Sequence, residues 1–215
     1  MTYRFQEILR LVVPGLYVLF LCFCLVVNTS LIELSTTSTL YKILSSSFSN
    51  ALAIMLPFIG FVMGYIINTI GSLCERVSYK RGWIKRPSAV ILSGNSKYQV
   101  DSLEDIKHEL KIDKVTNPNA NKAFQMAKEH LYISGNESIS IFYAQSILAR
   151  NLACGQILIT IFSAAVMFKH CDKAFIWVIA SLVLSSILLY NWRRQTCVYA
   201  KYVFANYGKS VVKPK

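Results

Sequence analysis

A cluster of basic residues follows the second apolar stretch of the sequence. Its members are Arg76, Lys80, Arg81, Lys85 and Arg86. Guanidinium and ammonium groups gathered in this way attract an anionic ligand such as a nucleotide, and they also mark the cytoplasmic end of a membrane-spanning helix. We favour membrane topology over nucleic-acid binding as the origin of the basic balance, and we expect no duplex nucleic acid as a partner. A site for a small anion remains a second role for the cluster.

Neutral polar residues form a second candidate set inside apolar sequence. Gln156, Thr160 and Ser163 are spaced by four and three residues, so they share one face of a helix. Ser181 and Ser185 have the same relation in the next apolar stretch. Polar stripes of this kind either form hydrogen bonds between helices or line a water-filled path, and both interpretations stay open.

Small residues indicate close helix packing in the second apolar stretch. Gly60 and Gly64 form a GxxxG pair whose face continues through Asn68. Glycines at this spacing let two helix backbones approach in lipid, with pore lining as the alternative role. Pro57 predicts a kink in the same helix. Arg150, at the expected membrane entry of the third stretch, either reaches lipid phosphates or forms a ring at the inner mouth of an oligomeric pore.

Catalytic chemistry has little support in the sequence. His108 and His130 are isolated on predicted helices, and neither has the spacing of a metal site with cysteine or acid. The charged residues around His108 are typical of a solvated helix face. No Asp, Glu, Lys, Arg or His lies inside the apolar stretches, which disfavours a proton-coupled pump. We therefore expect no enzyme, no metal and no cofactor.

Four apolar stretches must position these residues. The chain has 215 residues, 54% of them hydrophobic and only 16% charged, whereas soluble domains carry roughly 25% charged residues. Each stretch is long enough to cross a bilayer core of about 30 Å. The sequence predicts an all-α membrane protein with four transmembrane helices and a mostly helical cytosolic insert. The stretches cover about 11–27, 51–73, 152–168 and 174–190.

Basic residues beside the stretches predict the orientation. The tail after Tyr190 carries six basic residues and no acidic one, in keeping with a net charge of +12. Excess Lys and Arg place both termini and the insert in the cytoplasm, as for a bacterial inner-membrane protein. The expected parts are a first transmembrane pair with its outer loop (1–74), the insert (75–150), a second pair (151–192) and a basic cytosolic tail (193–215).

The insert is expected to begin with a short extended segment over 87–98. A helix near 102–114 is indicated by an opening capping box. A second helix runs from Asn117, as N-cap, to about 132. One long helix over 137–168 is expected to leave the membrane and continue into the insert, either as an element that transmits a ligand signal or simply as a long helix.

Two short motifs carry a resemblance. Residues 64–68 read Gly-Tyr-Ile-Ile-Asn, and residues 143–152 end in Ala-Arg-Asn-Leu. With the overall layout, they resemble small bacterial membrane proteins encoded beside nucleotide-signalling enzymes in phage-defence operons, such as the membrane effectors of Hailong-type systems. The resemblance implies a homo-oligomeric pore that a nucleotide or short oligonucleotide from a partner enzyme opens or closes, which depolarises the infected cell. No ligand-binding residue is carried over.

Three functions follow as hypotheses. The leading one is an oligomeric ion channel or pore-forming membrane effector, with the second or third apolar helix lining the path and the insert sensing an anionic ligand. The first alternative is a noncatalytic membrane scaffold or assembly protein, in which the polar stripes only hold helices together. The second alternative is a membrane enzyme that acts on lipid, which the missing catalytic constellation disfavours.

Overall fold

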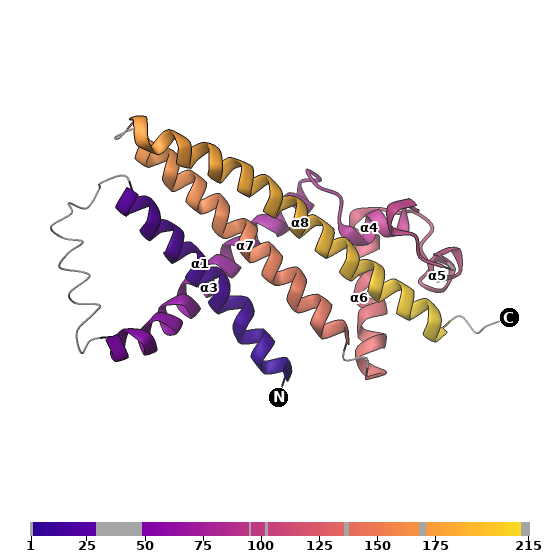
Figure 1. Cartoon of the computed structure of the whole chain (residues 1–215). Coiled ribbons are helices and arrows are strands. Elements are labelled where there is room, and N and C mark those ends of the chain that lie inside the picture. The colour runs from indigo at the N-terminus through magenta and orange to yellow at the C-terminus, as the bar shows by residue number, and fades with distance from the viewer. Residues whose placement is uncertain are drawn as a thin grey trace. The chain divides into compact units, whose positions relative to one another are not determined.

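The computed structural model describes residues 2–28, 49–94, 96–101, 103–135, 138–167 and 171–211, which form helices joined by short turns (Figure 1). No strand occurs in these ranges, so the all-α prediction is confirmed. Most of the predicted outer loop, residues 29–48, lies outside the described residues, as does Ser102 of the expected capping box.

Four of the described helices are long and apolar enough to cross a membrane. They contain the four predicted apolar stretches and support an integral membrane protein. Each helix is longer than its apolar stretch, because polar sequence continues the same helix beyond it. The four are α1 (Thr2–Asn28), α3 (Ser49–Lys80), α7 (Ser138–Met167) and α8 (Cys171–Val211).

The chain divides into two compact units. The first, here the membrane unit, comprises Met1–Gly71 and Ile147–Tyr190. The second, here the insert unit, comprises Ser72–Ser146 and Asn191–Lys215. Helices α3, α7 and α8 contribute residues to both units. Helix α7 runs without interruption from Ser138 to Met167, as the single long helix predicted from the sequence does.

The membrane unit is built on a crossing of α1 and α3 (Figure 1). A β-carbon added to Gly15 would overlap the backbone oxygen of Gly60, and one added to Gly64 would overlap the backbone oxygen of Leu11. Because the two backbones touch, only glycine fits at Gly15 and Gly64. This contact supports the helix-packing interpretation of the GxxxG pair.

Apolar side chains from three helices complete the centre of the membrane unit. Val18 of α1, Ile67 of α3 and Ile159 of α7 are each at most 5% exposed and pack together. Leu25 of α1 packs with Val166 of α7 in a second small cluster. Many other apolar side chains of this unit are exposed, as a lipid-facing surface requires.

The insert unit has a hydrophobic core of its own. Three short elements, α4 (Pro87–Leu92), the 3₁₀ turn η1 (Ser96–Tyr98) and α5 (Leu103–Glu109), pack there with α6 (Asn117–Ile133). The most buried large side chains of this core are Ile91, Leu92, Ile106, Ile139, Val203 and Phe204. Val203 and Phe204 belong to α8, so residues of the predicted basic tail are helical and buried in this core.

Three local predictions for the insert are wrong. Residues 87–92 form α4 instead of an extended segment, because Pro87 suits the first turn of a helix and the following apolar residues are buried. The helix expected over 102–114 ends at Glu109, and Lys111 then has a φ of 52°. The N-cap of α6 is Thr116, whose hydroxyl accepts a hydrogen bond from the Asn119 N–H. The Asn117 side chain instead forms hydrogen bonds with the backbone of Arg86 and Tyr79.

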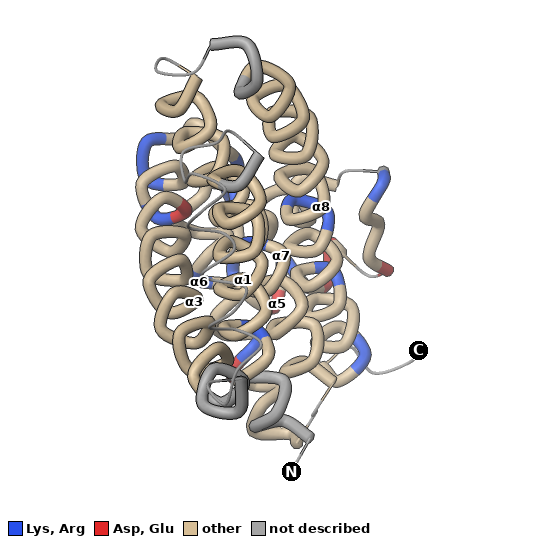
Figure 2. Tube along the Cα trace, turned by 60° about the vertical axis from the view of Figure 1, so that its left-hand side comes forward, with Lys and Arg blue, Asp and Glu red and all other residues tan. Residues whose placement is uncertain are grey.

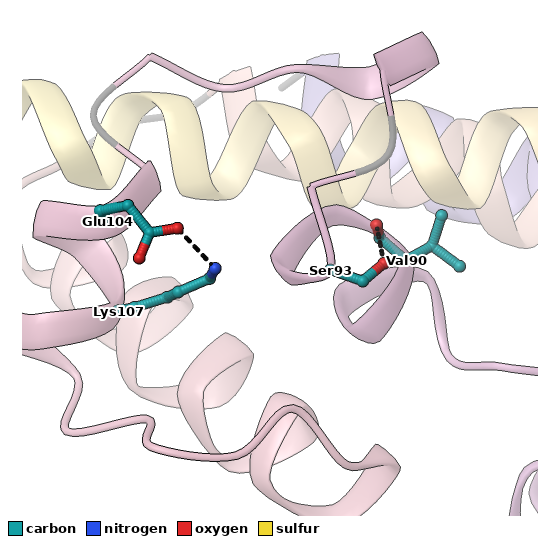
Figure 3. A network of polar contacts seen from close by, with 4 residues as sticks. All are labelled: Val90, Ser93, Glu104 and Lys107. Atoms are coloured by element: carbon teal, nitrogen blue, oxygen red, sulfur yellow. Dashed lines mark hydrogen bonds and ion pairs between the residues drawn. The ribbon is translucent and has the colours of Figure 1, made fainter.

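Short polar contacts close the turns of the insert unit. The Ser93 hydroxyl donates to the Val90 carbonyl at the end of α4, and Lys107 forms an ion pair with Glu104 at 2.7 Å within α5 (Figure 3). Gly94 has a φ of 76°, a left-handed conformation that glycine adopts without strain in the turn after α4. The side chains of Glu104 and His108 are exposed, as expected for a solvated face.

Candidate functional site

The last turns of α3 place four side chains on one face of the insert unit. Ser72, Glu75, Arg76 and Tyr79 are spaced by three, one and three residues, so successive turns of the helix bring them together. Arg86, the residue immediately before α4, also contributes its side chain. These five residues line a pocket of about 180 Å³. Two guanidinium groups and one carboxylate give the pocket a net positive charge.

Arg86 is held in place by its neighbours. Its Nη1 donates to Asn121 Oδ1 at 2.7 Å, and its backbone N–H donates to Asn117 Oδ1 at 3.0 Å. Its guanidinium carbon lies 5.0 Å from the centre of the Tyr79 ring, a cation–π distance. Asn117 also donates to the Tyr79 carbonyl at 3.5 Å. Because the side chain is already oriented, little conformational entropy is lost when it binds an anion.

Only two of the five predicted basic residues line this pocket, namely Arg76 and Arg86. Lys80, Arg81 and Lys85 are exposed and lie outside its lining. The Arg81 guanidinium stacks instead on the Trp83 ring, 5.1 Å from its centre.

Apart from Lys173 in its first turn, the basic residues of α8 lie in its C-terminal half (Figure 2). One of them, Arg193, donates to the backbone carbonyl of Lys85. It is therefore engaged with the segment that connects α3 to α4, beside the residue that precedes Arg86. Because this contact ties α8 to that segment, it helps to fix the backbone that carries Arg86.

Sequence reasoning missed Ser72, Glu75, Tyr79, Asn117 and Asn121 as parts of this site. A helix continued past the apolar stretch places Ser72 and Tyr79 beside Arg76, so their spacing held a usable signal. The roles of Asn117 and Asn121 depend on the turn between α3 and α4, whose path is not encoded in a helical period. The sequence predicts the cluster of basic residues, but it does not predict which of them line the pocket.

The polar stripes of the membrane unit meet one another. The Tyr17 hydroxyl donates to Gln156 Oε1, and Gln156 Nε2 donates to the Ser181 carbonyl at 3.4 Å. The hydroxyls of Thr160 and Ser185 lie 2.9 Å apart. Gln156 is 0% exposed, so these groups bond between α1, α7 and α8 inside one copy of the protein. The geometry favours the helix-interface interpretation of the stripes.

Asn68 and Arg150, predicted separately, form a pair. Arg150 Nη2 donates to Asn68 Oδ1 at 2.7 Å, which joins α7 to α3. The next residue, Asn151, is 0% exposed and donates to the Arg10 carbonyl at 3.2 Å. Ser163, the third member of the α7 stripe, is also 0% exposed. The ring and lipid-contact roles of Arg150 stay predictions.

Replacing Gln156 by leucine tests the polar network of the membrane unit. We expect the free energy of unfolding to fall by about 0.6–1.7 kcal/mol, the range for hydrogen bonds between transmembrane helices, because Tyr17 loses its acceptor. A double-mutant cycle with Tyr17→Phe, measured by SDS titration in detergent, isolates the pair. Additive effects of the two changes would contradict a direct bond, and Ile157→Leu on the exposed side of α7 is the control.

No known protein family, curated protein or solved structure matches this chain. Among the described residues, no three His, Cys, Asp or Glu side chains come together as a metal site. The His130 ring packs edge-on against Tyr207 at 5.4 Å, and His108 is exposed.

Lys128 is a further titratable group of the insert unit. Its amino group lies 5.1 Å from the centre of the Tyr143 ring and 5.5 Å from that of Tyr132. Burial lowers the pKa of Lys128, and the neighbouring Glu129 carboxylate partly opposes that shift. The two aromatic rings account for the position of this cation, which packs α6 against α7.

Proposed function

We propose that this protein is a homo-oligomeric ion channel or pore-forming membrane effector controlled by an anionic ligand in the cytosol. The observation that best supports this proposal concerns α3. This helix holds both the glycines that pack against α1 and four of the five residues that line the basic pocket. A ligand bound at Arg76 would therefore contact the same helix that packs against α1 in the membrane unit.

The row of residues along α3 supports this coupling. Gly60, Gly64, Asn68, Ser72 and Arg76 follow one another at steps of four residues, so they form a continuous ridge of the helix. Asn68 accepts from Arg150 on α7. A shift of α3 on ligand binding would thus change its contacts with both α1 and α7, which is the kind of two-state element that gating requires.

The output that we propose is ion conduction, as the resemblance of residues 64–68 and 143–152 implies. Since Gln156 and Thr160 are engaged inside one copy, the proposed path runs between copies. The exposed polar side chains of α3 in the membrane unit are Tyr65 and Thr69, among the described residues. We place them on the path, and antiphage defence by membrane depolarisation is the proposed role.

Current through planar bilayers tests the proposal. Purified protein should give discrete conductance steps that change when nucleotides or short oligonucleotides are added on the insert side. Thr69→Lys should shift the reversal potential toward anions, because a ring of positive charge repels cations. Ser186→Lys is the matched control on the exposed face of α8 and should leave selectivity unchanged. Silence from folded, oligomeric preparations would contradict conduction.

A noncatalytic membrane scaffold is the second candidate. The observation that favours it is that Gln156, Thr160, Ser181 and Ser185 bond to one another or to Tyr17 within one copy. Polar groups that form hydrogen bonds with one another between helices are not available to line a path for ions. Under this alternative, the protein forms stable assemblies, shows no current, and Thr69→Lys changes nothing that a bilayer recording measures.

A further inference from the structure

We infer that the pocket at the end of α3 binds a phosphate monoester group. This inference rests on the proposed function, because it names the chemistry of the anion that the insert unit senses. It concerns the pocket lined by Ser72, Glu75, Arg76, Tyr79 and Arg86. Four features restrict the chemistry of the ligand: the hydrogen-bond donors, the carboxylate, the size of the pocket and its place along α3.

The donors of the pocket suit a phosphate. Arg86 is fixed by Asn121 and presents a planar guanidinium, the group best matched to phosphate oxygens. Arg76 of α3 is exposed and adds a second guanidinium to the lining. The Tyr79 hydroxyl is buried and has no hydrogen-bond partner among the described residues.

Glu75 selects a monoester over a diester. A carboxylate in the lining repels a fully ionised anion, whereas it attracts a protonated phosphate that can donate a hydrogen bond. A phosphate monoester has a second pKa near 6, so it readily carries one proton that it can donate to Glu75. A phosphodiester has no such proton. The lining therefore disfavours an internal phosphate of an oligonucleotide and favours a terminal phosphate.

The size of the pocket restricts how much of the ligand enters. Its volume is about 180 Å³. Sites that enclose a whole organic ligand usually measure about 300–1,000 Å³. The pocket thus takes the phosphate and leaves the remainder of the molecule outside.

The place of the pocket along α3 makes a lipid headgroup a second source of the phosphate, beside a cytosolic ligand. Leu73 ends the apolar stretch, and Arg76 follows three residues later, about 4.5 Å further along the helix. The headgroup layer extends about 5–7 Å beyond the hydrocarbon core. Trp83, 68% exposed and stacked with Arg81, is typical of that layer. A soluble nucleoside monophosphate offers the same chemistry from the other side.

Binding to full-length protein in an uncharged detergent tests the inference. The probes are short-chain phosphatidic acid, short-chain phosphatidylcholine, inorganic phosphate and adenosine monophosphate, with affinity measured by thermophoresis. We expect phosphatidic acid to bind and phosphatidylcholine, a diester, not to bind. Arg86→Gln should raise the Kd at least tenfold, whereas Arg81→Gln, which removes the same charge outside the pocket, should change it less than twofold.

The outcomes separate the sources of the phosphate and the two proposals. Binding of inorganic phosphate and the nucleotide as tight as that of phosphatidic acid supports the site and assigns a soluble ligand. Equal losses in Arg86→Gln and Arg81→Gln would overturn the site, since general attraction then explains the binding. Should Arg86→Gln unfold, Arg76→Gln at an exposed position gives the same comparison. Pocket-dependent binding without any bilayer current refutes the proposed channel alone.

Discussion

Replacing Gly64 by alanine is expected to lower the free energy of unfolding by about 3 kcal/mol, at the upper end for an over-packed site. A β-carbon at Gly64 would lie far inside 3.0 Å of the Leu11 backbone oxygen, and real β-carbons essentially never approach an atom that closely. The obstacle is backbone, so no side-chain rotation relieves it. The two helices must separate, which also opens the Val18 and Ile67 contact. SDS titration followed by circular dichroism measures the loss.

Gly71 provides the matched control, since it lies on the same helix seven residues further along. A β-carbon there would lie 3.5 Å from Cys154 Cβ, which is an ordinary van der Waals contact. Alanine also has a better helix propensity than glycine by about 1 kcal/mol. We expect Gly71→Ala to be neutral or slightly stabilising. Equal losses at Gly64 and Gly71 would show that a general cost of substitution, and not backbone contact, explains the effect.

The apolar stretches and the single long helix α7 could be predicted from the sequence because each depends on local composition. The hydrophobic length of a span can be read directly from the sequence, and so can the lack of Gly or Pro from 137 until Gly155. The same holds for the GxxxG pair. Its partner Gly15 was not predicted, because a single glycine beside Pro14 gives no spacing to match against another helix.

Tertiary choices could not be predicted in the same way. The sequence offered Arg76, Lys80, Arg81, Lys85 and Arg86 as equivalent cations. What distinguishes Arg86 is a pair of asparagines from α6, more than thirty residues away, and that depends on how α4 and α6 pack. The pairing of Gln156 with Tyr17 likewise joins distant segments. Periodicity gives the face on which a residue lies, but not the residue that it meets.

The C-terminal tail shows the same limit most clearly. Its six basic residues predicted a cytosolic segment with no assigned structure. Between them, Ala200, Val203, Phe204 and Tyr207 recur at spacings of three, one and three, which is the pattern of a buried helix face. The charge drew the interpretation toward topology, although the apolar period was present in the same residues.

Phe204→Ala is expected to have an even larger effect and to be confined to the insert unit. Phe204 is 0% exposed and packs its ring edge-on against Phe124 of α6 at 5.9 Å. Truncation of a buried phenylalanine to alanine costs about 3–5 kcal/mol, because burial is lost and a cavity remains. Hydrogen exchange followed by mass spectrometry should show a marked loss of amide protection in α6.

Lys209→Ala is the control for this prediction, since it changes an exposed residue in the last turn of the same helix. Protection of α6 should stay unchanged in that variant. If residues 193–215 formed only a basic tail, neither Phe204→Ala nor Lys209→Ala would change the protection of α6. A loss restricted to Phe204→Ala means that α8 helps to build the unit that carries the basic pocket. Deletion of the tail would then remove ligand sensing through loss of folding and not through loss of charge.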